Sequence, residues 1–133
     1  MKIVNFAEMN SELNRFVAEI RDIHIQQDRL RFRKNLERIG EVMSYEISKD
    51  FRYSEKLVTT PLGTARVNTA DDKIVIGTIL RAGIPYHQGF LNYFDRAENA
   101  FVSAYRKYKD KLNFEIFIEY MASPRIDGKI LIL

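Results

Sequence analysis

The pattern of hydrophobic and polar positions changes along the chain. Residues 11–49 carry hydrophobic positions at helical spacing, whereas residues 56–133 read as strands with one short helix between them. The clearest helical pattern has hydrophobic residues spaced 4, 3, 4 and 4 apart, which is the spacing of one face of an amphipathic helix. These residues are Phe32, Leu36, Ile39, Met43 and Ile47. The pattern predicts a helix that begins near Asp28 and ends near Asp50. An earlier face, formed by Leu13, Phe16, Val17 and Ile20, predicts a first helix with Ser11 as its N-cap.

The second part of the chain contains four segments with strand character. Residues 73–80 are apolar and barely alternate, which is typical of a central parallel strand covered on both faces. A short helix is expected around residues 88–94, and a further strand over residues 100–105. Residues 114–120 alternate, which predicts a strand with Phe114, Ile116, Ile118 and Tyr120 on one face. Residues 129–133 read as the start of another fully buried strand.

Turn signals connect these segments. Pro61 and Gly63 interrupt a short extended segment, and Asp127-Gly128 marks a turn.

The segment from Tyr105 to Glu119 is predicted as a β-hairpin arm with Lys109-Asp110-Lys111 at its tip. Such an arm projects apolar side chains beyond its own sheet, so it predicts a homodimer; a locally packed hairpin is the alternative. The last strand ends on apolar residues, so either something else caps it or the sequence is a truncated piece of a longer protein.

Composition narrows the class of protein. A chain of 133 residues and 15.6 kDa is one domain or a piece of one. A hydrophobic content of 46% excludes a wholly disordered chain, and no apolar stretch of about 18 residues exists to span a membrane. The absence of cysteine excludes disulfides, thiolate zinc sites and a cysteine nucleophile, and the cytoplasm is the expected compartment. A net charge of +3 fits a protein that handles phosphates but equally fits an ordinary soluble protein.

The candidate chemistry lies between Ile76 and Pro85. There, a buried strand runs directly into a small-residue loop, Arg81-Ala82-Gly83, and then into a helix. Ligands of open α/β sheets bind beyond the carboxyl ends of the strands, and an arginine fork suits phosphate oxygens. A glycine in the loop lets the backbone approach a ligand closely. The alternative is an ordinary turn whose arginine pairs with a nearby carboxylate.

A second arginine strengthens the phosphate interpretation. Arg106 follows the next predicted strand, and two parallel strands would place Arg81 and Arg106 at the same edge of the sheet. Two cations beside a glycine loop describe a site for a polyanion such as pyrophosphate. The alternative for Arg106 is a solvated basic loop that it shares with Lys107, Lys109 and Lys111.

These residues resemble the uracil phosphoribosyltransferases. The resemblance rests on the string from Gly77 to Gly83 followed by Tyr105-Arg106, and it extends from about Leu13 to Leu133. Supporting matches are Phe32-Arg33, Tyr45-Glu46 and Thr60-Pro61-Leu62-Gly63. The resemblance implies an α/β fold: a phosphoribosyltransferase-type, Rossmann-like and mostly parallel sheet with N-terminal helices and a β-hairpin arm. It also implies a single domain over residues 1–133, with a helical segment at 1–55 and part of the α/β core at 56–133.

The resemblance implies a reaction in pyrimidine salvage. Uracil displaces pyrophosphate from 5-phosphoribosyl 1-pyrophosphate and forms uridine monophosphate. In the family, the residues that match Arg81, Ala82, Gly83 and Arg106 bind the phosphoribosyl substrate, Mg²⁺ is bound mainly through its pyrophosphate, and the enzyme is a homodimer. No protein nucleophile is required, and no catalytic residue is assigned. The sequence ends before the family's ribose-phosphate loop and uracil segment, so the 133-residue chain alone is expected to be inactive. Residues 84–88 also depart from the family pattern.

Two other features admit a functional interpretation. The basic run of Arg29, Arg31, Arg33, Lys34 and Arg38 suggests an RNA-binding regulator of pyrimidine genes on a related fold. The solvated face of an amphipathic helix explains this run better, because Phe32 falls on the core face. His87 could donate to a phosphate, but a helix-start residue with a water or backbone partner is the favoured interpretation. His24 is assigned no role, and two distant histidines argue against a protein metal site.

Overall fold

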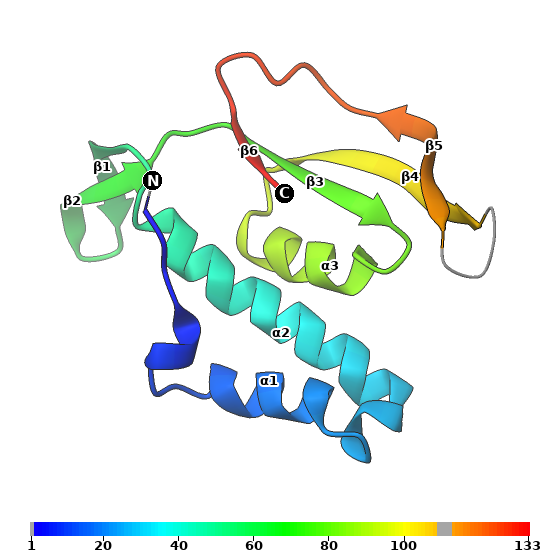
Figure 1. Cartoon of the computed structure of the whole chain (residues 1–133). Helices are drawn as coiled ribbons and strands as arrows, with labels where there is room; N and C mark the ends of the chain where they lie inside the picture. Colours follow the sequence, from blue (N-terminus) through cyan, green and yellow to red (C-terminus); the bar gives the residue numbers. More distant parts are fainter. Residues whose placement is uncertain (1, 109–112) are drawn as a thin grey trace.

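The computed structural model describes residues 2–108 and 113–133. The helices and strands follow one another as Figure 1 shows. They are η1 (Phe6–Glu8), α1 (Leu13–Arg21), η2 (Ile25–Gln27), α2 (Arg29–Ser48), β1 (Tyr53–Thr60), β2 (Gly63–Ala70), β3 (Ile74–Leu80), α3 (Ile84–Tyr93), β4 (Glu98–Tyr108), β5 (Phe114–Ala122) and β6 (Ile130–Ile132).

The two predicted N-terminal helices are present. Asp28 caps α2, because its Oδ1 accepts hydrogen bonds from the backbone N–H groups of Leu30 at 3.1 Å and Arg31 at 3.0 Å. The predicted start of this helix is therefore confirmed. The predicted cap of α1 is wrong by one residue: Glu12 holds the N-cap position and makes no side-chain cap bond. Its carboxylate is engaged with the Arg15 guanidinium instead.

The sheet is mixed and mostly parallel. Its strand order is β5-β4-β3-β6, in which β3 pairs in parallel with β4 and β6, and β5 is antiparallel to β4. The chain reaches β4 from β3 through α3, which is the crossover that a parallel pair requires (Figure 1). This arrangement confirms the predicted α/β class and the central position of β3.

The hairpin of β1 and β2 forms a second sheet of its own. The two strands pair from Tyr53 with Ala70 to Thr60 with Gly63, and Pro61 and Leu62 form the turn. Gly63 has φ of 133°, a conformation that residues with a side chain rarely adopt. The sequence pattern indicated a short extended segment here but not a complete hairpin, because most of its side chains are exposed and carry no burial pattern.

The core lies between α3 and one face of the four-stranded sheet. Ile76, Phe90, Phe94 and Ile132 form its buried centre, and Met43 and Ile47 of α2 pack against it among other partly buried residues. α2 thus covers α3 from outside, so the sheet, α3 and α2 form three successive layers (Figure 1). Apolar burial of this kind contributes about 1.5–3 kcal/mol for each large side chain that is fully buried.

The prediction of burial on both faces is confirmed at the beginning of β3, where Val75 and Ile76 on opposite faces are both buried, but it is wrong for the end of β3 and for β6. Val75 is fully buried, but Ile79 on the same face of β3 is 64% exposed. In β6, Ile132 faces the core whereas Leu131 is 41% exposed, and Leu133 after the strand is 90% exposed. The reason is that α3 packs on one face only, so on the other face side chains such as Ile79 and Leu131 are less covered.

The predicted alternation of β5 is interrupted by a bulge. Ser103 pairs with Tyr120, whereas the next residue, Ala104, pairs with Ile118, so Glu119 is an extra residue in this strand. Paired residues point to the same face of a sheet, so Ile118 and Tyr120 lie on opposite faces. The prediction that they share a face is therefore wrong. The hairpin of β4 and β5 itself is present, and the predicted tip, Lys109-Asp110-Lys111, lies outside the described residues.

Candidate functional site

The loop between β3 and α3 is a compact turn held by three backbone hydrogen bonds. The Gly83 N–H donates to the Ile79 carbonyl at 3.2 Å, and the Ile84 N–H donates to the Arg81 carbonyl at 3.3 Å. The His87 N–H then donates to the Gly83 carbonyl at 2.9 Å. Arg81 and Ala82 lie on the exposed side of this turn. The loop is therefore fixed at its base while its outer residues face solvent.

Gly83 is required by the way the loop folds back on β3. A Cβ at this position would lie 2.8 Å from the Thr78 methyl carbon and 3.0 Å from the Ile79 carbonyl oxygen. Gly83 has an ordinary φ of −74°, so the requirement is space and not backbone conformation. A glycine was predicted to let the backbone approach a ligand, but the close approach seen here is to the protein's own strand.

The Arg81 side chain is available to a ligand. Arg81 is exposed, and its side chain forms no hydrogen bond or ion pair with any residue in the described ranges. The alternative in which Arg81 pairs with a nearby carboxylate therefore gains no support from the described part of the chain. The backbone N–H of Ala82 likewise has no backbone partner among the described residues. One guanidinium and one amide thus stand free at the carboxyl end of the central strand, where an anion can accept from both.

Arg106 and the Arg81 loop both lie toward the carboxyl ends of the parallel strands β3 and β4, and Arg106 lies further along the strand direction. Leu80, the last residue of β3, pairs with Ser103 of β4, so β4 continues past the end of β3 as part of the arm. From the rise of a strand, Arg106 lies about 10 Å beyond the Leu80–Ser103 pair along β4. Its guanidinium carbon lies 4.9 Å from the centre of the Phe114 ring. Arg106 and Lys107 belong to a strand, so the alternative of a solvated basic loop is wrong for these two residues; Lys109 and Lys111 lie outside the described residues.

His87 is buried and bonded through both ring nitrogens. Its side chain belongs to a residue only 5% exposed, with Nδ1 2.8 Å from the Thr78 Oγ1 and Nε2 2.8 Å from the Asn99 Oδ1. The ring also lies 5.0 Å from the ring of Phe101. The prediction of a water or backbone partner for this side chain is wrong. The signal that could have revealed part of the contact is Thr78, the polar residue in an otherwise apolar strand.

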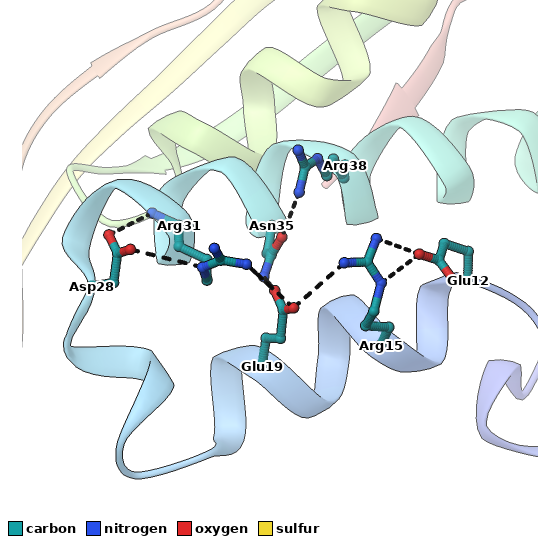
Figure 2. A network of polar contacts seen from close by, with 7 residues as sticks. All are labelled: Glu12, Arg15, Glu19, Asp28, Arg31, Asn35 and Arg38. Atoms are coloured by element: carbon teal, nitrogen blue, oxygen red, sulfur yellow. Dashed lines mark hydrogen bonds and ion pairs between the residues drawn. The ribbon is translucent and has the colours of Figure 1, made fainter.

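Two members of the basic run, Arg31 and Arg38, contact α1 and help to pack it against α2 (Figure 2). Glu19 of α1 accepts a hydrogen bond from the Asn35 amide at 2.6 Å and lies 3.4 Å from the Arg31 Nη1. The Asn35 hydrogen bond, followed by the charge of Arg31, lowers the pKa of the Glu19 carboxyl. Asn35 is fully buried and accepts a hydrogen bond from Arg38 at 3.0 Å.

The rest of this run supports the same interpretation. Lys34 pairs with Glu37 at 2.7 Å, and Phe32 is partly buried and not presented for stacking. Three of the five cations of the run therefore have polar partners within the fold. This arrangement fits the predicted ionic face of an amphipathic helix and gives no support to an RNA-binding surface.

Other features of the described residues lie away from Arg81. A cavity of about 660 Å³ opens at the amino ends of β3 and β4, and Phe51, Lys73, Tyr93 and Arg96 are among the residues that line it. The Arg81 loop follows the carboxyl end of β3, so this cavity belongs to the opposite edge of the sheet. Within residues 2–108 and 113–133, no group of three or more His, Asp or Glu side chains could hold a metal ion. No helix in this part of the chain is long and apolar enough to cross a membrane.

Solved structures include a chain with the same architecture. The structure of the AQ2163 protein from Aquifex aeolicus superposes with a TM-score of 0.74 and 31% sequence identity. The match covers 90% of this chain and 55% of that one.

Sequence comparisons identify the family. The family model described as uracil phosphoribosyltransferase matches residues 9–133. A uracil phosphoribosyltransferase of Porphyromonas gingivalis is 62% identical over 133 residues, which are all of this chain and 62% of that protein. A uracil phosphoribosyltransferase of Methanothermobacter thermautotrophicus is 38% identical over 104 residues, 77% of this chain and 47% of that protein. The chain thus spans about half to two thirds of the length of these relatives. With a family match over nearly its whole length and an arginine loop at the carboxyl end of its central strand, the chain belongs to the uracil phosphoribosyltransferase family.

Proposed function

We propose that the protein transfers the phosphoribosyl group of 5-phosphoribosyl 1-pyrophosphate to uracil, and so works in pyrimidine salvage. The products are uridine monophosphate and pyrophosphate. The observation that carries the proposal is the free Arg81 guanidinium on a compact loop at the carboxyl end of β3. The P. gingivalis relative, named for this enzyme and 62% identical over the whole chain, supports the same activity.

The geometry suits the charge changes of this reaction. The bond from the ribose C1′ to the pyrophosphate oxygen breaks, and a bond from C1′ to uracil N1 forms as that nitrogen loses its proton. Negative charge develops on the departing pyrophosphate, so donors fixed in advance at that position lower the barrier. Arg81 and the Ala82 N–H supply such donors on a loop that the backbone bonds of Gly83 and Ile84 hold in place. Gly83 keeps the loop close to β3.

Arg106 extends the site outward along β4. Its position beyond the end of β3, with its guanidinium over the Phe114 ring, allows it to meet the phosphoribosyl substrate from the arm. Two arginines, one on the loop and one on the arm, can hold a polyanion from two sides. This arrangement favours productive alignment of the two substrates, which lowers the entropic part of the barrier.

Mg²⁺ enters this proposal as part of the bound substrate. Mg²⁺ commonly binds through substrate phosphates and keeps several waters, so it needs no cage of protein carboxylates. The described residues around the arginine loop provide cations and amides, which fit a pyrophosphate that brings its own metal ion. When bound there, the ion neutralises part of the charge on the leaving group.

The proposal includes a homodimer in the cytoplasm. The arm of β4 and β5 exposes several apolar side chains, among them Ile116 at 70%, Ile118 at 63% and Met121 at 70%. Apolar surface of this kind on a projecting hairpin favours burial against another protein surface, and a second copy of the chain is the partner that the family resemblance implies.

Arg81→Ala tests the assignment. The complete protein is purified and incubated with radiolabelled uracil, 5-phosphoribosyl 1-pyrophosphate and Mg²⁺, and uridine monophosphate is measured. Loss of one transition-state donor is expected to lower kcat by about 100-fold or more. Arg66→Ala is the matched control, because Arg66 is an exposed arginine of β2 that pairs with Glu55 at 2.9 Å. Equal turnover by Arg81→Ala and the control would refute the site.

A further inference from the structure

We infer that His87 is a positioning residue, which orients Thr78 and thereby holds the Arg81 loop in the form that binds pyrophosphate. The inference deepens the proposed function and rests on it. His87 lies on α3, is almost fully buried, and contacts both β3, which leads into the Arg81 loop, and β4, which carries Arg106. No substrate is expected to touch it.

The hydrogen bonds fix the tautomer of the ring. The Asn99 Oδ1 can only accept a hydrogen bond, so the His87 Nε2 carries the proton. In the neutral ring, Nδ1 then has a free lone pair and accepts the proton of the Thr78 hydroxyl, 2.8 Å away. His87 is thus a donor toward β4 and an acceptor toward β3. Because both nitrogens are used, the ring has one defined orientation.

Thr78 connects His87 to the loop, because its hydroxyl bonds the ring and its methyl lies against Gly83. Its Cβ carries the hydroxyl on one side and the methyl on another, so fixing the hydroxyl also fixes the methyl. A Cβ added to Gly83 would lie 2.8 Å from this methyl carbon. The Gly83 backbone therefore rests against the Thr78 methyl, and a rotated Thr78 would change the surface on which the loop lies.

The backbone of His87 acts on the same loop. Its N–H donates to the Gly83 carbonyl at 2.9 Å, so one residue holds Gly83 through its main chain and, by way of Thr78, through its side chain. On the other side, Asn99 is bound in register with Ile76 near the beginning of β4. His87 therefore couples the end of β3, the arginine loop and the strand that leads to Arg106.

Two substitutions separate the two hydrogen bonds of the ring. In His87→Asn the amide oxygen can take the place of Nδ1 and accept from Thr78, while the bond to Asn99 is lost. In His87→Gln the amide nitrogen reaches the place of Nε2 and can donate to Asn99, while the acceptor for Thr78 is lost. Thr78→Val removes the hydroxyl and keeps the shape of the side chain. His24→Asn is the matched control, because His24 is an exposed residue and its side chain has no partner among the described residues.

The experiment measures the Kd of Mg²⁺-pyrophosphate by calorimetry and the hydrogen exchange of the Gly83 and Ile84 amides without ligand. His87→Gln and Thr78→Val are expected to bind pyrophosphate about five- to tenfold more weakly and to exchange these amides faster, since each lacks one hydrogen bond. His87→Asn and His24→Asn are expected to stay close to the unsubstituted protein in both measurements.

The outcomes distinguish this inference from the proposed function. Equal pyrophosphate affinity and equal exchange in Thr78→Val, while Arg81→Ala loses binding, would overturn the role of His87 and leave the proposed function standing. Equal affinity in Arg81→Ala would overturn the proposed function, and the amide exchange would still report whether His87 and Thr78 hold the loop. If His87→Gln fails to fold, Thr78→Val decides, because it leaves the histidine in place. Equal losses in His87→Asn and His87→Gln would show a packing role and contradict the inference.

Discussion

Gly89 of α3 lies directly against the backbone of Glu37 in α2. A Cβ at Gly89 would stand 2.0 Å from the Glu37 carbonyl oxygen, and one at Gly40 would stand 2.6 Å from the Tyr86 carbonyl oxygen. The two helices therefore cross at a pair of glycines, and this contact fixes the distance of α2 from α3. Since α3 begins directly after the Arg81 loop, the crossing also supports the candidate site from behind.

Gly89→Ala is expected to destabilise the protein. The obstructing atom is backbone, so α2 and α3 must separate, and overpacking of this kind costs about 1–3 kcal/mol or more. Urea unfolding would measure the change in the free energy of unfolding. Gln88→Ala is the control at the neighbouring exposed position, where a change within about 0.5 kcal/mol is expected. Equal stability of the two variants would contradict the close crossing.

Gly83→Ala is expected to impair the loop more than the fold. The new methyl group would meet the Thr78 methyl carbon and the Ile79 carbonyl oxygen, so the loop must move away from β3. Because alignment of catalytic groups is sensitive to shifts of about 1 Å, we expect a fall in kcat of about 100-fold. The thermal midpoint is expected to fall by a few degrees only, since the loop is exposed. Unchanged kcat would show that the loop tolerates displacement.

The Glu19 network is expected to weaken in acid. The pKa of Glu19 is lowered from its ordinary value of 4.5, first by the Asn35 hydrogen bond. A lowered pKa means that the folded state prefers the carboxylate, so its stabilising effect is present above pH 4.5 and is lost as the pH falls through the lower folded value. Glu19→Gln should remove this part of the acid dependence of unfolding (Figure 2).

Urea unfolding at a series of pH values between 3 and 7 would measure this effect. Glu119→Gln is the matched control, because Glu119 is exposed on β5 and takes no part in the network. If Glu19→Gln and Glu119→Gln keep the same acid dependence as the unsubstituted protein, the charge of Glu19 does not join α1 to α2.

Phe114 is expected to influence the substrate through Arg106. Its ring lies 4.9 Å from the Arg106 guanidinium carbon, and a cation–π contact at an exposed site is worth about 0.5–1 kcal/mol. Phe114→Leu should therefore raise the KM for 5-phosphoribosyl 1-pyrophosphate by about two- to fivefold. Arg106→Ala should raise it further. If Phe114→Leu raised this KM more than Arg106→Ala, the prediction that Phe114 acts through Arg106 would be contradicted.

The elements with a strong local signal could be predicted from the sequence. The spacing of hydrophobic residues and Asp28 located α2 closely, and the apolar run at 73–80 located the central strand. The small-residue loop with Arg81 was visible because it follows that strand directly. What could not be predicted depends on contacts between distant residues: the bulge at Glu119 follows from pairing with β4, and the exposure of Ile79 follows from which face α3 covers.

The same distinction applies to the site. Arg81, Gly83 and Arg106 could be proposed as site residues from the sequence because arginine and glycine have specific roles near phosphates. The connection of His87 to Thr78 and Asn99 was not, since it joins residues from three elements and has no sequence spacing of its own. The partners of Glu19 on α2 were hidden for the same reason.

The most direct test of the proposed activity is the uracil-dependent release of pyrophosphate from 5-phosphoribosyl 1-pyrophosphate. The complete protein, and not the 133-residue chain alone, is purified and mixed with this substrate and Mg²⁺, with and without uracil, and both products are measured in one sample. We predict pyrophosphate and uridine monophosphate in equal amounts, with no release when uracil is omitted. Pyrophosphate released without uracil, or no uridine monophosphate at saturating concentrations of both substrates, would contradict phosphoribosyl transfer as the function of this protein.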